Sequence, residues 1–510
     1  MLYIIFLVLS LLLFTAIRFR TILIVLTIVR LLHALQTGLT YDEVYYWNWS
    51  RHLDYWFYDQ GPGIALSLSA STKLFGNTLL AIKIVPVICN GIFLACGYLL
   101  VKQLYTVSTA RIWAALIATT PLYIIGGEIG TYDAPLMAAW ALSALLAWNA
   151  LTRKSPILWL AAGLTCSLGV LSKLPMLAFP FGLLLTCLCH RTFRPQLASP
   201  WPWIAGLLSL LPIPLMYQWD RTHEHLFTLH SQSLGNRHTS AMIFRWTEDL
   251  IGGQLLILGP FLYVILTVAL IRYAVQKRSE QSTFVTSLSL PLLIVCLALS
   301  LKSKLEVNWP IAAYLTALIP LAVCIDTVRL RQRIAVYSAL CFNLALIIVM
   351  DNPECIHKIT GKTVSKSLGV KLNERFGWDE IETQLRLRLP STTGNDGVFV
   401  AGTNYRTTSM LSWMLKPSTN IECLFQGTRL NQFYLWNTQS LRSGQTAFIV
   451  LEAPDLTDIE KIKPFFDSVV ELQPPIEIMR TGFENPIKTF HIFQGIQFKP
   501  FNIKENHAGY

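Results

Sequence analysis

The chain has 510 residues, of which 53% are hydrophobic and only 14% charged, and its mean hydropathy is +0.47. Ordinary soluble domains carry about 25% charged residues, so the composition excludes a chain built only from such domains. The net charge of +11 does not indicate nucleic-acid binding, because Lys and Arg form short clusters at the ends of apolar runs, as membrane topology signals do. The first 350 residues hold only 13 of the 30 acidic side chains, which predicts a membrane domain over 1–350 and a polar domain over 351–510.

Apolar runs near the length needed to cross the hydrocarbon core of a bilayer predict a polytopic α-helical membrane protein with about twelve spans. The first run is followed by basic residues but lacks the basic start and cleavage site of a signal peptide, so we interpret it as a short membrane helix. The predicted spans are 2–17, 21–36, 79–100, 110–126, 134–150, 157–172, 174–189, 201–219, 253–271, 284–301, 308–325 and 334–350.

Basic residues predict how these spans are oriented. With Arg18 and Arg20 in the cytoplasm, every second connection is basic, as the positive-inside rule requires. The other connections then face outward, namely the predicted catalytic loops 37–78, 127–135, 220–250 and 302–308. The last span also leads outward, so residues 351–510 are expected in the periplasm or another exoplasmic space.

The polar tail alternates β-prone and helical segments, which predicts a small α/β domain. Strands are expected at Val398–Ala401, Thr446–Leu451 and Thr489–Phe493, and helices at Trp378–Leu389 and Thr457–Asp467. Cys355 and Cys423 are the cysteines of this tail, and in an exoplasmic space they could pair.

The first outer loop contains adjacent carboxylates, Asp42 and Glu43, followed by the aromatic residues Tyr45, Tyr46 and Trp47. An acidic pair at a membrane surface can act as a general base, a cation ligand or a positioning group. The alternative is a helix N-cap formed by Thr40 or Asp42. The aromatic residues are either an interfacial belt or a platform for a sugar.

Further charged groups lie on other outer connections. Glu128 and Asp133 are close to the membrane surface, where acids are costly unless they are used or paired, although Asp133 could simply cap a helix. Lys173, Lys302 and Lys304 are outward cations that break the topology rule, which predicts an anionic ligand such as a lipid-linked phosphate. Each of these lysines could instead extend along the membrane to its interface.

The loop after residue 219 is rich in histidine. The pair His223 and His225 could ligate zinc, but no third ligand is evident from spacing. The seven-residue spacing of His223 and His230 would place both on one face of a helix, where they could bind phosphate or sugar. Metal dependence stays open, and a divalent cation is a possible cofactor.

In these residues the chain resembles the polyprenyl-phosphate-sugar-dependent glycosyltransferases of the C superfamily, in the branch of protein mannosyltransferases and lipid A aminoarabinose transferases. The motifs are Asp-Glu-x-Tyr-Tyr-Trp with an aromatic Asp-x-Pro-Pro-like element, Gly-Glu-x-x-Thr-x-Asp-Ala-Pro, Leu-Ser-Lys and Asn-Trp-Pro. They correspond to Asp42, Glu43, Tyr45, Tyr46, Trp47, Tyr58, Asp59, Pro62, Gly127, Glu128, Thr131, Asp133, Ala134, Pro135, Lys173, Asn308, Trp309 and Pro310. Gln60 departs from the family, whose members often have His or Lys there.

The resemblance implies transfer of a sugar from a polyprenyl phosphate to a lipid A, glycan or protein acceptor at the outer membrane face, with inversion. Because the tail is similar to that of bacterial members, the resemblance also implies a bacterial inner membrane. Asp42 would be the catalytic carboxylate, with Glu43 beside it. The expected ligands of the donor phosphate are Lys173, Lys302, Lys304, His223 and Arg237. The expected acceptor-binding or sugar-binding residues are Tyr45, Tyr46, Trp47, Asp59, Gln60, Glu128, Asp133, Glu306 and Asn308.

A polytopic transporter or flippase for a lipid-linked anion is the alternative. Such a protein should have polar groups near the bilayer midplane and helices broken by Gly or Pro in related halves. Here the ionisable residues crowd the predicted outer rim, which favours the enzyme, although Pro175, Pro180, Pro212 and Pro214 do interrupt helices.

Overall fold

The computed structural model describes residues 18–235, 243–276, 279–327, 330–364, 372–389, 397–416, 421–424, 430–453 and 456–501. The chain divides into two compact units. The first comprises Met1–Leu35 and Leu53–Ile348, and the second comprises Gln36–His52 and Val349–Tyr510. The short segment after the first described helix therefore belongs with the C-terminal part of the chain, which its position in the sequence does not suggest.

The first unit is helical. Its longer helices are α2 (Phe19–Gln36), α4 (Gly63–Phe75), α5 (Leu79–Leu104), α6 (Val107–Ala118), α8 (Asp133–Arg153), α9 (Pro156–Ser172), α10 (Ala178–Cys189), α12 (Pro212–Thr222), α13 (Leu226–Gly235), α14 (Ile243–Leu258), α15 (Pro260–Val275), α16 (Glu280–Ser300) and α19 (Leu330–Asp351). Shorter helices are α7 (Pro121–Ile124), α11 (Trp201–Ser209), α17 (Tyr314–Ala317) and α18 (Ile319–Thr327). Single 3-10 turns occur at Gly126–Glu128, Leu174–Leu177, Arg194–Ala198 and Ile311–Ala313.

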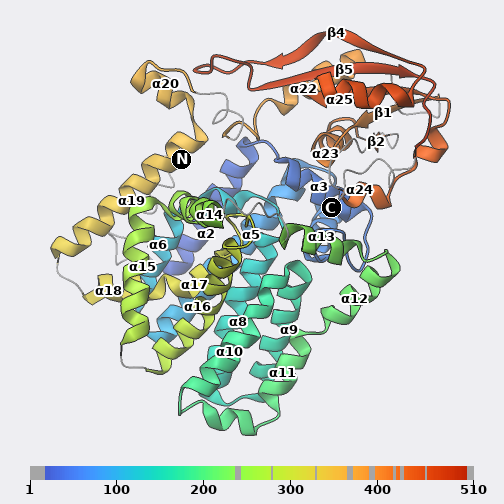
Figure 1. Cartoon of the computed structure of the whole chain (residues 1–510). Coiled ribbons are helices and arrows are strands. Elements are labelled where there is room, and N and C mark those ends of the chain that lie inside the picture. The colour runs from blue at the N-terminus through green and yellow to red at the C-terminus, as the bar shows by residue number, and fades with distance from the viewer. Residues whose placement is uncertain are drawn as a thin grey trace. The chain divides into compact units, whose positions relative to one another are not determined.

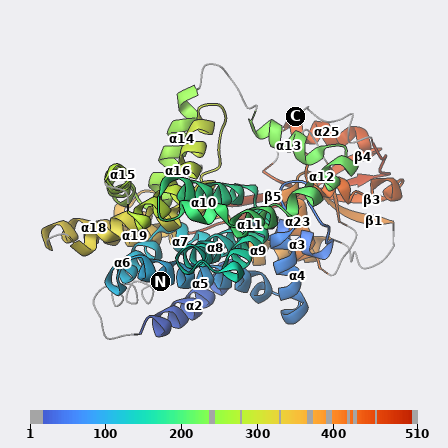
Figure 2. The ribbon, with the colours of Figure 1, turned by 90° about the horizontal axis from the view of Figure 1, so that it is seen from below.

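The core of this unit forms where α8 packs between α5 and α9, an arrangement visible in Figure 2. Trp113, Trp140 and Trp159 are fully or almost fully buried there among small Ala and Gly residues. A Cβ atom on Gly97 would lie 2.0 Å from the Trp113 ring, and one on Gly163 would lie 2.6 Å from the Ala205 carbonyl oxygen. Small residues at such positions let membrane helices approach closely.

Within the described residues, five helices are long and apolar enough to cross a membrane. These are α2, α5, α8, α16 and residues Ile334–Asp351 of α19, and two bent helix pairs would bring the number to seven. The structure thus agrees with a polytopic helical membrane protein but does not confirm twelve spans. The predicted span 2–17 lies outside the described residues.

The predicted span over 253–271 is not one straight helix. The chain bends by 105° between Phe244–Leu258 and Pro260–Val275, where Gly259 has a φ of 87° and Pro260 has no backbone N–H to donate. The side chain of Asn343 donates a hydrogen bond to the Leu258 carbonyl at 2.8 Å. This polar side chain satisfies a carbonyl that the break leaves without a helical partner. The predicted span 201–219 is likewise divided, into α11 and α12.

The second unit contains a five-stranded sheet in its described part, with the order β2-β1-β3-β5-β4, drawn in orange to red in Figure 1. The strands are β1 (Val398–Gly402), β2 (Ile421–Cys423), β3 (Thr446–Glu452), β4 (Ser468–Ile478) and β5 (Lys488–Ile496). Strands β2, β1 and β3 are parallel, with Val400 opposite Phe448. Strand β5 pairs antiparallel with β3, and β4 pairs antiparallel with β5. The helices are α3 (Tyr41–Arg51), α20 (Glu354–Thr360), α22 (Trp378–Arg388), α23 (Tyr405–Met414), α24 (Gln432–Leu435) and α25 (Leu456–Ile462).

The predicted α/β tail is therefore confirmed, with all three expected strands and the helix at 378–389 present. Strand β4 is not predicted from the sequence because it contains Pro474 and Pro475, and its pairing with β5 shifts register between Leu472 and Ile476. Proline is tolerated there because β4 is an edge strand.

The possible Cys355–Cys423 disulfide is not formed. Both thiols are free, and Cys423 is buried in β2 while Cys355 lies on α20.

Candidate active site

Helix α3 carries the predicted catalytic carboxylates, and its start is fixed by a capping box. The Thr40 hydroxyl accepts a hydrogen bond from the Glu43 backbone N–H at 3.3 Å, and the Glu43 carboxylate accepts one from the Thr40 backbone N–H at 2.9 Å. Such reciprocal bonds satisfy backbone donors that the first helical turn leaves unpaired. Glu43 is completely buried. The helix N-cap, which was the alternative interpretation of the acidic pair, is therefore present, and Glu43 supplies its carboxylate.

Asp42 points instead toward helix α23 of the same unit. The Tyr405 hydroxyl donates a hydrogen bond to Asp42 Oδ1 at 3.3 Å, and Arg406 Nε lies 3.4 Å from the Tyr405 hydroxyl oxygen. Burial alone would lower the pKa of Arg406, but the neighbouring Tyr405, Asp42 and Glu374 raise it, so the guanidinium stays charged. Asp42 is thus a carboxylate with a phenol and a cation next to it.

Tyr41, immediately before Asp42, is held by acidic and basic groups of the C-terminal part of the chain. Its hydroxyl donates to both oxygens of Glu452, at 2.7 and 2.8 Å, and its backbone N–H donates to Glu374 Oε1 at 3.3 Å. Burial raises the pKa of the Tyr41 phenol and that of the Glu374 carboxyl. Burial also lowers the pKa of Lys488, which donates to the Glu374 carbonyl at 3.1 Å, to about 8.

The aromatic residues of α3 pack inside the second unit. Trp47 is fully buried and meets the Trp413 ring edge-on at 5.0 Å, and Tyr45 is 1% exposed and accepts a hydrogen bond from the Gln432 backbone N–H at 2.8 Å. Tyr46 is also buried. Contact of these three rings with a sugar stays a prediction, and what the geometry shows is that they anchor α3.

In the first unit, Asp133 is the centre of a polar group. Lys173 Nζ is 2.8 Å from Asp133 Oδ1, and the Asn308 amide donates to Asp133 Oδ2. The side chains of Lys173 and Asp133 are only 2% and 10% exposed. Lys173 also lies over the Tyr132 ring, 4.6 Å from its centroid. Three sequence motifs far apart in the chain meet here, and the charge of Lys173 is already balanced by a carboxylate.

Glu128, in the same motif as Asp133, has a partner that no sequence motif indicates. His33 on α2 places Nδ1 3.0 and 2.8 Å from the two Glu128 carboxylate oxygens, and Glu128 is fully buried. A single His near the end of an apolar run carries no signal of its own. Only the packing of α2 against the segment after α7 could reveal the pair.

The second half of the first outer loop lies in the first unit. Asp59 Oδ1 is 3.3 Å from His230 Nε2, and the Tyr58 and His230 rings are 4.8 Å apart. The Oε1 atom of Gln60 is buried and has no hydrogen-bond partner among the residues that the structure describes. Asp54 accepts a hydrogen bond from the Trp219 indole N–H at 2.8 Å.

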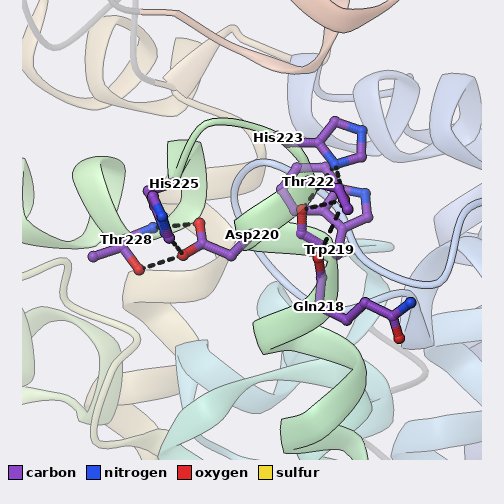
Figure 3. A network of polar contacts seen from close by, with 7 residues as sticks. All are labelled: Gln218, Trp219, Asp220, Thr222, His223, His225 and Thr228. Atoms are coloured by element: carbon purple, nitrogen blue, oxygen red, sulfur yellow. Dashed lines mark hydrogen bonds and ion pairs between the residues drawn. The ribbon is translucent and has the colours of Figure 1, made fainter.

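Figure 3 shows His223 and His225 beside Trp219 and Asp220. His223 stacks on the Trp219 ring at 4.1 Å, and His225 and Thr228 both contact the Asp220 carboxylate, at 3.2 and 2.6 Å. The two Thr228 hydrogen bonds and His225 lower the pKa of Asp220 although its partial burial opposes this.

The prediction that His223 and His230 share one helical face is wrong. Helix α12 ends at Thr222 and α13 begins at Leu226, and the intervening Glu224 and His225 have positive φ angles.

The remaining predicted phosphate ligands lie on a short connection after α16. Lys302, Lys304 and Glu306 are all exposed, whereas Asn308 is half-buried against Asp133. Arg237 lies outside the described residues. Among the residues that the structure describes, no group of three or more His, Cys, Asp or Glu side chains could hold a metal ion.

Comparisons with known proteins relate this arrangement to a family. Residues 59–219 match the model of the dolichyl-phosphate-mannose-protein mannosyltransferase family. The chain is 25% identical to the lipid A galacturonosyltransferase RgtD of Rhizobium johnstonii over 369 residues, which cover 69% of this chain and 76% of the relative.

Two solved structures share the fold across almost the whole chain. ArnT from Cupriavidus metallidurans bound to undecaprenyl phosphate superposes with a TM-score of 0.63 at 11% identity, covering 93% of this chain and 98% of that one. The apo state of the same protein gives a TM-score of 0.61 at 12% identity, with 93% and 97% covered. These sequence similarities support a membrane glycosyltransferase.

In this glycosyltransferase the predicted site residues fall into one set in each unit. The second unit holds Asp42 and its neighbours on α23, and the first unit holds the Asp133 group, the Glu128 pair and the exposed lysines. Sequence motifs located most of these positions. Their partners His33, Tyr405 and Arg406 were not among the predicted site residues, because the sequence alone does not show which distant side chains lie beside these carboxylates.

Proposed function

We propose that this glycosyltransferase moves a sugar from a polyprenyl-phosphate donor to lipid A at the outer face of the bacterial cytoplasmic membrane. The similarity to a lipid A galacturonosyltransferase carries the proposal, because it extends over more than two thirds of the chain. The fold shared with a protein that binds undecaprenyl phosphate supports the donor class. The outward orientation of the loops and of the C-terminal domain rests on the distribution of Lys and Arg.

In the proposed reaction an oxygen of the acceptor attacks the anomeric carbon of the sugar. The new carbon–oxygen bond forms as the bond from that carbon to the phosphate oxygen breaks, which inverts the anomeric centre and releases polyprenyl phosphate. Asp42 takes the proton of a hydroxyl acceptor, whereas a phosphate acceptor at neutral pH needs no deprotonation and would only be oriented by Asp42. Glu43 is better suited to hold α3, since it is buried in the capping box.

The leaving phosphate requires cations. We assign Lys302 and Lys304 to this role first, because both are exposed, and a cation next to the leaving oxygen stabilises the charge that develops on it. His223 and Arg237 remain candidates from the sequence. Because Lys173 is paired with Asp133, we assign Lys173 to fixing the position of Asp133. The residues proposed to contact the sugar or the acceptor are Asp133, Glu128, Asp59, Gln60, Glu306 and Asn308.

The test is a transfer assay with the purified full-length protein in lipid nanodiscs. Radiolabelled undecaprenyl-phosphate galacturonic acid, mannose and aminoarabinose are each offered with lipid A, and products are separated by chromatography. We expect transfer to lipid A from one of these donors and at least a 100-fold loss in Asp42→Asn, an order of magnitude typical for a missing catalytic acid or base. Asp379→Asn, an exposed change on α22, is the matched control.

Transport of the lipid-linked sugar across proteoliposomes without any transfer would overturn the enzymatic assignment. Transfer to a protein or glycan acceptor but never to lipid A would retain the enzyme and overturn the acceptor.

A further inference from the structure

The C-terminal part of the chain holds the helix that bears Asp42. We propose that Tyr405 and Arg406, at the start of α23, are positioning residues for the Asp42 carboxylate, so that the C-terminal domain is part of the catalytic apparatus. This inference rests on the proposed role of Asp42 and assigns a function to the domain that follows the membrane helices.

The direction of the hydrogen bonds is set by the chemistry of the three side chains. Arginine can only donate, so the Tyr405 oxygen must accept from Arg406 Nε. The single hydrogen of the Tyr405 hydroxyl is then directed to Asp42 Oδ1, at 3.3 Å. An ionised carboxylate is the acceptor that such a donor prefers. The chain from Arg406 through Tyr405 to Asp42 thus stabilises the ionised form of Asp42, the form that a general base or an orienting group requires.

The Tyr405 hydroxyl is itself held in place. Tyr405 is the first residue of α23, which Asn404 caps by accepting a hydrogen bond from the Thr407 N–H at 3.0 Å. The Tyr405 ring packs 4.8 Å from the Tyr45 ring of α3, one turn beyond Asp42. The donor and the helix that bears the acceptor are therefore fixed to one another by packing that does not involve the hydrogen bond.

The first turn of α3 is also fixed on its other side. Besides the contacts of Tyr41 with Glu452 and Glu374, the segment before α3 lies against the backbone of Arg375. A Cβ atom on Gly38 would come within 2.0 Å of the Arg375 carbonyl oxygen, so that only glycine allows this approach. Removal of the Tyr405 hydroxyl should therefore leave the helix in place and release only the carboxylate.

Because only the Asp42 carboxylate would be released while α3 stays in place, we can predict which kinetic constant changes. A reacting group that is misplaced by about 1 Å can lose on the order of 100-fold in rate, whereas the binding of the donor should hardly change. We expect Tyr405→Phe to lower kcat by roughly 10- to 100-fold, with the donor KM and the affinity for undecaprenyl phosphate unchanged within a factor of about two. Arg406→Lys keeps a cation near Tyr405 and should retain more activity than Arg406→Gln.

The experiment measures kcat, donor KM, undecaprenyl phosphate affinity and thermal stability for the full-length variants in nanodiscs. Controls are Tyr217→Phe, which alters an exposed tyrosine on α12, and Lys463→Gln, which removes an exposed cation of the second unit. The double variant Asp42→Asn with Tyr405→Phe should be no slower than Asp42→Asn alone, because both changes act through one carboxylate.

Two outcomes overturn the positioning role: a Tyr405→Phe variant with kcat within a factor of two of the parent, or one whose loss of activity follows its loss of thermal stability. Failure of the proposed function looks different, since the parent protein itself would then transfer no sugar. Failure of the role of Asp42 alone would leave Asp42→Asn transferring sugar at the parental rate.

Discussion

The ion pair between Lys173 and Asp133 provides the sharpest energetic test of the first unit. Their charged atoms are 2.8 Å apart, and the side chains are 2% and 10% exposed. Removal of one partner from a buried pair leaves an uncompensated charge and costs about 3–5 kcal/mol, whereas removal of both charges is often nearly neutral. Lys173→Met should therefore lower the free energy of unfolding by about 3–5 kcal/mol, and adding Asp133→Asn should restore most of it.

The expected effect is large enough for thermal unfolding of the detergent-solubilised protein, followed by tryptophan fluorescence. At roughly 2–4 °C per kcal/mol for a large domain, Lys173→Met should lower Tm by roughly 6–20 °C. The exposed lysines offer a matched control, since Lys302→Met and Lys304→Met should change Tm by less than about 2 °C while weakening donor use. If Lys173→Met has the same Tm as the parent, or if adding Asp133→Asn to Lys173→Met lowers Tm further, the two charges do not stabilise each other and the reasoning fails.

Three further predictions concern the second unit. Burial lowers the pKa of Lys488 from 10.5 to about 8, so the unfolded chain binds more protons between these values, and the free energy of unfolding should rise with pH from about 8 toward 10. Lys488→Gln should flatten that rise in denaturant titrations, and an unchanged slope would contradict it. Glu43→Gln should keep activity, because Gln also completes a capping box. Inactivity of a stably folded Glu43→Gln would show that the carboxylate is needed. Thr40→Ala, which removes the other half of the cap, should lower the free energy of unfolding by about 1 kcal/mol. Burial raises the pKa of Cys423 to about 12, so maleimide at pH 7.5 should label it only after unfolding, as mass spectrometry can establish.

Local patterns were sufficient for much of the fold. Alternating β-prone segments located β1, β3 and β5, and the acid after Thr40 indicated a cap at the start of α3 as one of two interpretations. Hydropathy recognised α5, α8 and α16 as long apolar helices. It failed at Gly259–Pro260, where apolar composition continues through a sharp bend, because hydropathy measures the preference for lipid and not the backbone hydrogen bonds that proline removes.

The candidate site shows the same division. Motifs placed Asp42, Asp133 and Lys173 among residues with chemical roles, since acids and cations near lipid are costly unless they are used or paired. Whether such a residue is paired within the protein depends on which charged side chains lie within a few ångströms of it in the folded chain. The sequence could not show that the charge of Lys173 is neutralised by Asp133, 40 positions earlier. It also could not show that the Glu43 carboxylate binds the backbone at the start of its own helix.

The amino-acid sequence by itself determined that the chain enters a membrane, that a polar α/β domain follows, and which charged residues interrupt the apolar pattern. Those properties depend on the composition of short segments. Tertiary structure alone decided that α3 joins the C-terminal unit and that Tyr405 and Arg406 lie beside Asp42. A hydrogen bond between residues 363 positions apart depends on how distant surfaces pack, and no local pattern encodes that packing.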